Sequence, residues 1–102
     1  MARTLVLIAG ILLVAPFDAM ADEVEGPRCV QVRKSAPYRG FGHHHIVTVR
    51  NTCDDAVRCR VSTNVTPQTH SMSGPAGEEE SVITRTGSPA SVFEAIVDCE
   101  TQ

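Results

Sequence analysis

The sequence predicts an all-β fold, a small antiparallel β-sandwich stapled by disulfide bonds. The sheets are indicated by short segments in which apolar and polar residues alternate, separated by clusters of Gly, Pro, Asn, Asp and Ser. The staples are indicated by four cysteines that follow a secretory leader. No window beyond the leader combines helical periodicity with capping residues, so we expect no helix in the domain.

Residues 1–21 have the pattern of a cleavable secretory signal of bacterial type. Arg3 precedes an apolar run, 5–14, and the small residues Ala19 and Ala21 end the leader. The run is too short to cross a bilayer, and no later segment is apolar enough to do so. We therefore expect an exported protein without a membrane span, located in the periplasm or outside the cell, in which residues 22–102 form a single β-sandwich domain.

Composition narrows the class of partner. The chain has 9 Lys and Arg against 12 Asp and Glu, and removal of the leader leaves its net charge at −3. Beyond the leader its aromatic residues are Tyr38, Phe41 and Phe93, and it contains no tryptophan. An acidic exported domain with so few stacking residues is not expected to bind nucleic acid. The same shortage leaves a thin core, so a chain of this size needs covalent staples.

Two segments carry the strict alternation of a half-buried strand. In 56–62 apolar residues alternate with arginine and serine, which places Cys59 on the apolar face. In 92–99 the apolar face begins with Phe93 and ends with Cys99. Three further β-rich runs are expected to be strands: 28–33, 46–50 and 81–86.

The connections between these runs have turn composition. The polar stretch 51–55 is expected to join two strands as a hairpin, and 74–77 has proline and glycine at favoured turn positions. The Gly-Ser-Pro-Ala stretch 87–90 breaks the chain before the last strand. Five or more short strands without a helix predict two antiparallel sheets packed face to face.

The Pro-Ala-Gly-Glu stretch 75–78 before a strand, and a final strand that ends at Cys99, resemble immunoglobulin-like β-sandwich modules. The resemblance covers most of residues 22–102 and implies two packed antiparallel sheets. It brings no functional residue with it, so the function has to be argued from the residues themselves.

Four cysteines, Cys29, Cys53, Cys59 and Cys99, allow three disulfide pairings, and sequence alone does not choose among them. Cys59 and Cys99 both lie on the inward face of alternating strands, which favours a bridge between the two sheets, and Cys29 then pairs with Cys53. A four-thiolate zinc site is the alternative. Zinc modules bring their ligands in closer pairs than Cys53 and Cys59, so we expect disulfides.

Three consecutive histidines, His43 to His45, open the run 46–50. Residues two apart in a strand share a face at a spacing of about 6.5 Å, so His43 and His45 form a candidate copper or zinc pair, with His70 as a third ligand. The set is incomplete, because no carboxylate or cysteine lies at a spacing that completes it. The competing interpretation, which we favour, is a solvated strand end.

Three arginines are candidates for an anion-binding surface: Arg50, Arg58 and Arg60. Arg58 and Arg60 share the outward face of one strand, and Arg50 is placed across the expected hairpin from them; a general role in solubility is the competing interpretation. No serine lies in a nucleophile-elbow pattern, and a domain of this size offers little concavity for a catalytic site. We therefore expect that the protein is not an enzyme.

The sequence favours an exported, non-enzymatic binding or recognition module that acts in the periplasm or outside the cell. The expected partner is a protein, a peptide or a cell-envelope glycan, and no cofactor is expected. The alternative is a periplasmic copper- or zinc-binding protein that uses His43 and His45. The oligomeric state is left open, because exposed strand edges also pair between copies.

Overall fold

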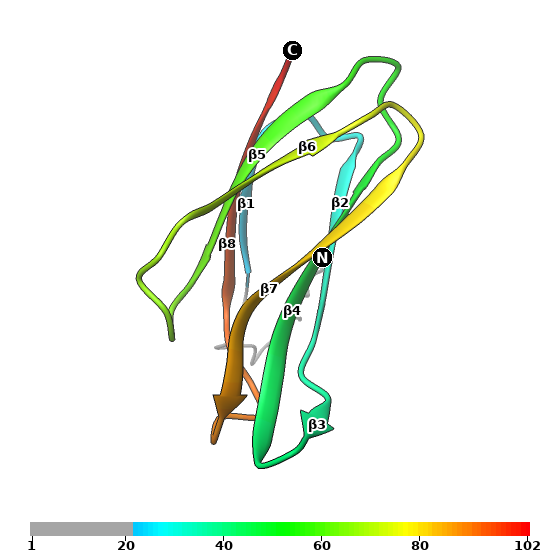
Figure 1. Cartoon of the computed structure of the whole chain (residues 1–102). Coiled ribbons are helices and arrows are strands. Elements are labelled where there is room, and N and C mark those ends of the chain that lie inside the picture. The colour runs from blue at the N-terminus through cyan, green and yellow to red at the C-terminus, as the bar shows by residue number, and fades with distance from the viewer. Residues whose placement is uncertain (1–21) are drawn as a thin grey trace, which may run out of the picture.

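The computed structural model of the chain describes residues 22–102, so the predicted leader lies outside the described residues. These residues form two β-sheets that face each other, without a helix (Figure 1). The strands in chain order are β1 (Glu23–Glu25), β2 (Val30–Ser35), β3 (Tyr38–Arg39), β4 (Gly42–Asn51), β5 (Val57–Thr63), β6 (His70–Gly74), β7 (Glu79–Ser88) and β8 (Ala95–Thr101). The prediction of an all-β, two-sheet architecture is confirmed.

The first sheet has the strand order β1-β8-β5-β6. β5 is antiparallel to β6 on one side and to β8 on the other. β1 adds to β8 in the parallel direction, with Val24 opposite Val97. Parallel pairing is possible here because the chain crosses to the other sheet between β1 and the rest of the first sheet.

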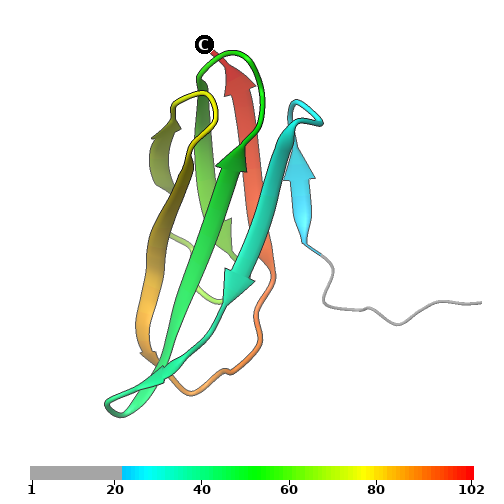
Figure 2. The same cartoon turned by 90° about the vertical axis from the view of Figure 1, so that its right-hand side faces the viewer.

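The second sheet is centred on β4. β2 pairs with most of its length, β3 pairs with its first residues, and β7 pairs along its other side. The register of β4 against β7 shifts on both sides of His45, where the regular ladder is interrupted. Such bulges increase local twist and redirect side chains. Beyond the bulge, β4 continues to Gly42, still paired with β3 and β7, and carries the β3–β4 hairpin to one end of the molecule (Figure 2).

Apolar residues from both sheets meet in one core. Phe93 is 1% exposed and is the largest fully buried side chain among the described residues. The alternation predicted for 56–62 is confirmed, because its inward residues are buried and its arginines exposed. The predicted inward face of the last strand is also confirmed. The buried apolar residues are Val30, Val47, Val49, Val57, Cys59, Val61, Phe93, Ala95, Val97 and Cys99.

Some strand boundaries differ from the prediction. The last strand begins at Ala95, so Phe93 reaches the core from the preceding loop. β1, β3 and β6 were not predicted, because each is short or rich in polar residues. The predicted hairpin at 51–55 is wrong: it joins β4 to β5, which lie in different sheets. A short polar connection fits a crossing between sheets as well as a hairpin, and the sequence does not separate the two.

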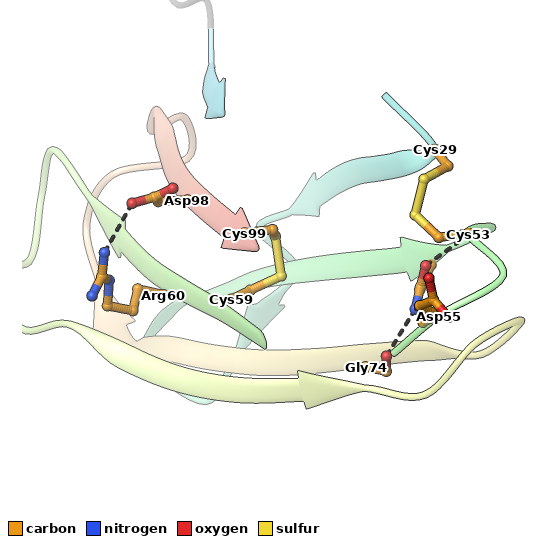
Figure 3. Close-up of a disulfide and its surroundings, with 9 residues drawn as sticks. Cys29, Cys53, Asp55, Cys59, Arg60, Gly74, Asp98 and Cys99 are labelled. Carbon is orange, nitrogen blue, oxygen red and sulfur yellow. Dashed lines mark hydrogen bonds and ion pairs between the residues drawn. A yellow bond between two sulfur atoms is a disulfide. The ribbon is translucent and has the colours of Figure 1, made fainter. Parts of the chain in front are cut away.

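The disulfides are Cys29–Cys53 and Cys59–Cys99, which are the favoured pairs (Figure 3). The predicted placement of the second bridge between the sheets is wrong. Cys59 and Cys99 are direct cross-strand partners on β5 and β8, within one sheet. Cys29 and Cys53 lie at the start of β2 and beyond the end of β4, which are neighbours in the other sheet. Inward parity established that the two cysteines share the core face, but not that they come from opposite sheets.

Candidate functional site

His45 is a core residue and not a solvated strand end, so the favoured interpretation is wrong for this histidine. Its ring is 0% exposed and stacks on Phe93, with the ring centroids 4.3 Å apart. Nε2 lies 2.8 Å from the carbonyl oxygen of Ala90. A carbonyl only accepts hydrogen bonds, so Nε2 carries the proton and donates it. His45 thereby fastens the loop after β7 to β4.

The structure does not bring the proposed metal ligands together. His43 places Nδ1 2.7 Å from the carbonyl oxygen of Ala36 and packs edge-on against Tyr38, whereas His45 is committed to the core. His70 lies on β6 of the other sheet, opposite Val61. Within residues 22–102, no three His, Cys, Asp or Glu side chains are grouped so that they could hold a metal ion. The described geometry therefore gives the metal hypothesis no support.

The three candidate arginines do not form one surface. Arg58 and Arg60 lie on β5, and Arg50 lies on β4 of the other sheet, so the expected juxtaposition of Arg50 with them is wrong. Carboxylates neutralise these faces locally. Arg60 lies 2.9 Å from Asp98 and Arg50 lies 3.5 Å from Glu79. Exposed pairs of this kind contribute little stability, but they reduce the positive charge around Arg50 and Arg60.

At one end of the sandwich, Asn51 joins the 51–56 connection to the end of β6. It is 0% exposed, and its Nδ2 donates to the carbonyl oxygens of Asp55 at 2.9 Å and Gly74 at 2.8 Å. Its Oδ1 accepts from the Cys53 amide at 2.8 Å. We call this region the disulfide end, made up of Cys29 and residues 51–56 and 74–78 (Figure 3). Sequence reasoning treated Asn51 only as a turn residue.

The opposite end carries exposed apolar side chains. We call it the hairpin end, residues 36–44 and 85–92, and it lies at the bottom of Figure 2. Phe41 is 91% exposed, more than any other large apolar side chain in residues 22–102. Tyr38 is 65% exposed and Val92 63%. Exposed aromatic and aliphatic groups gathered at one tip are typical of a contact surface.

Glycine makes this tip possible. A Cβ on Gly42 would lie 2.5 Å from the backbone carbon of Gly87, so the two strands approach here more closely than any side chain permits. Gly40 and Gly87 adopt positive φ angles of 68° and 66°. The Gly-Phe-Gly stretch is thus a tight turn held against β7, and it leaves the Phe41 ring pointing into solvent.

The hairpin end also differs in charge from the rest of the surface. Its two segments contain Arg39 and Arg85 and no Asp or Glu. Both arginines are exposed, and neither forms an ion pair in the described part of the chain. Asp54, Asp55 and Glu78 lie at the disulfide end, so the long axis of the domain has an acidic end and a basic, apolar end.

An open groove of about 260 Å³ adjoins the hairpin end. The chain after β2 forms one wall with Ala36, and the loop before β8 forms the other with Val92. Lys34 lies at its base, where Nζ donates to the Asp22 carboxylate at 2.7 Å. The lining is mixed, with Ser35 and Ser91 beside the apolar residues.

Sequence reasoning missed this site. Phe41 was considered only as one of the few aromatic residues, although an aromatic residue between two glycines in a polar stretch is itself a signal of exposure. The absence of acidic residues from both segments was also visible. The sequence does not show that the two segments lie side by side, because that depends on the pairing of β4 with β7.

Comparison with protein-family models, with curated proteins and with solved structures gave no match for this chain. The two disulfides are typical of proteins that fold in an oxidising, exported compartment. None of the residues from 22 to 102 belongs to a helix with the length and apolar character that crossing a bilayer requires.

Proposed function

We propose that this protein is an exported, non-enzymatic recognition module that binds its partner through the hairpin end. The observation that carries the proposal is the coincidence of Phe41, the most exposed large apolar side chain of the described residues, with a surface region that lacks acidic residues. Solvent exposure of a phenylalanine costs free energy that contact with a partner recovers. The rest of the surface offers mixed charge on both sheet faces.

The architecture supports the proposal. A rigid two-sheet scaffold presents a loop tip at one end, the arrangement by which β-sandwich modules commonly bind partners. We include the immunoglobulin-like character of the fold in the proposal, supported by antiparallel sheets with connections that cross between them. Export to the periplasm or beyond rests on the leader pattern of residues 1–21 and agrees with the two disulfides.

The experiment replaces Phe41 by a photo-crosslinking phenylalanine analogue, and in a matched sample replaces Ile83, which is 50% exposed on β7. Each oxidised protein is irradiated with the envelope fraction of the cells that express it. We expect a saturable adduct at position 41, competed by unlabelled protein and absent at position 83. No competed adduct at position 41, or the same adducts at both positions, contradicts recognition through the hairpin end.

A further inference from the structure

We propose that the partner of the hairpin end is an anionic phospholipid surface. This inference rests on the proposed function and specifies the chemistry of the partner. The Phe41 ring stands at a convex hairpin tip and is 91% exposed. A convex apolar group is buried only by a concave pocket or by a deformable medium. The headgroup and acyl boundary of a bilayer is such a medium.

The side chains around Phe41 match the layers of that boundary. Tyr38 is 65% exposed, and its ring is fixed edge-on against His43 at a centroid distance of 5.2 Å. Tyrosine is enriched at membrane interfaces because it combines an apolar ring with a polar hydroxyl. Val92 adds apolar area beside the groove. The tip thus offers a phenylalanine for the acyl region, with a tyrosine positioned at headgroup level.

The charges favour an anionic surface over a neutral one. Arg39 lies two residues from Phe41, and Arg85 pairs with His45 on the adjacent strand. With no carboxylate in either segment of the hairpin end, both guanidinium groups are available to phosphate oxygens. The acidic residues Asp54 and Glu78 lie at the disulfide end, so an anionic surface attracts one end of the domain and repels the other.

An extended peptide or a glycan fits the site less well. An extended peptide or a sugar chain needs a concave wall for its side groups, and the groove beside Val92 is open and small, about 260 Å³. Phe41 does not line this groove, so a ligand bound there leaves its ring exposed. A bilayer takes up the tip, the arginines and the groove rim together, which is why we favour it.

The test is flotation of the oxidised, exported protein with vesicles of phosphatidylglycerol and phosphatidylcholine in equal amounts, compared with phosphatidylcholine alone. We expect binding to the anionic vesicles that weakens as salt is raised. Phe41→Ser is expected to lower the partition coefficient by about tenfold or more. Its matched control Ile83→Ser, at an exposed apolar site on the sheet, is expected to leave it unchanged.

Charge is tested separately. Replacing Arg39 and Arg85 together by glutamine is expected to weaken binding to anionic vesicles by roughly thirtyfold. The matched control neutralises Arg28 and Arg58, which are exposed and lie outside the hairpin end. Equal losses in the two double variants show a response to net charge alone and overturn the assignment. Unfolding curves of each variant in urea establish that the loss is not a loss of fold.

The outcomes separate the two proposals. If the wild-type protein does not float with anionic vesicles, the lipid inference is overturned, and crosslinking from position 41 into delipidated envelope protein and glycan then decides the proposed function. A competed adduct there keeps recognition through the hairpin end with a different partner. If both assays are negative, both proposals fail. Flotation that survives Phe41→Ser overturns the role of the tip.

Discussion

At the disulfide end, Asn51 and the Cys29–Cys53 bridge fasten the loops to one another, whereas at the hairpin end the chain turns through glycines and leaves Phe41 in solvent. At the first end the Asn51 side chain bonds to the loops of the domain itself, whereas the second end leaves its apolar and cationic side chains exposed. The thin core explains why the two ends differ. A small domain depends on disulfide bonds to hold its strands together. Once the two sheets are rigid, the exposed tip loses little conformational entropy when it binds a partner.

Breaking the staple at the disulfide end is expected to have the largest effect. The bridge joins residues separated by 24 positions, and its removal in the Cys29→Ala and Cys53→Ala double variant is expected to cost about 3 kcal/mol of unfolding free energy. Urea unfolding of the oxidised proteins measures this. A cost below about 1 kcal/mol contradicts the importance of this bridge to the frame.

The next largest effect is expected from Asn51→Ala. The substitution removes three hydrogen bonds of a fully buried side chain and leaves the Gly74 carbonyl oxygen without its side-chain partner. We expect a loss of about 2 to 3 kcal/mol in unfolding free energy. The control is Asn64→Ala, because Asn64 is exposed and accepts one hydrogen bond, from the Glu94 amide. Similar losses for both variants contradict the special position of Asn51.

Two histidines of β4, one in the hairpin end and one in the adjoining core, sharpen the comparison. His45→Ala is expected to cost about 2 kcal/mol, because it opens space beside Phe93 and leaves the Ala90 carbonyl oxygen without its donor. His43→Ala removes a half-buried ring and is expected to cost less than about 1 kcal/mol. Thermal unfolding of both variants checks the order. A larger cost at His43 contradicts the assignment of His45 to the core.

A somewhat smaller loss of stability than for His45→Ala is expected at the base of the tip. Gly42→Ala puts a Cβ against the Gly87 backbone, which then has to move. We expect the free energy of unfolding to fall by about 1 to 2 kcal/mol. Gly40→Asn is the control, because open space surrounds Gly40 and asparagine tolerates its positive φ. Hydrogen exchange of the amides in β4 and β7 measures the effect. Unchanged protection after Gly42→Ala contradicts the close packing of the two strands.

Alternation predicted the inward faces of β5 and β8 from the sequence, because each has one buried face and the period of two is strict. It did not predict which strands share a sheet, since inward parity is the same on either side of the core. Alternation therefore predicts the Cys59–Cys99 pair but not that both cysteines lie in one sheet. In the same way, the composition of 51–55 predicts a connection between two strands but not that the strands lie in different sheets.

The candidate site was predicted less well, for a related reason. The ladder is interrupted beside His45, so simple alternation did not separate His43, on the rim, from His45, in the core. Asn51 has ordinary turn composition, and its role as a junction depends on the proximity of Gly74, which comes from a separate part of the chain. Phe41 was visible in the sequence, but its neighbours in space were not.

The most direct test of the division between the two ends is hydrogen exchange of the oxidised protein, resolved by segment, with and without anionic phosphatidylglycerol vesicles. We predict that residues 38–44 and 85–92 gain protection while 51–56 and 74–78 keep the protection of the free protein. Protection gained at the disulfide end or across a sheet face, with residues 38–44 unchanged, contradicts the assignment of recognition to the hairpin end.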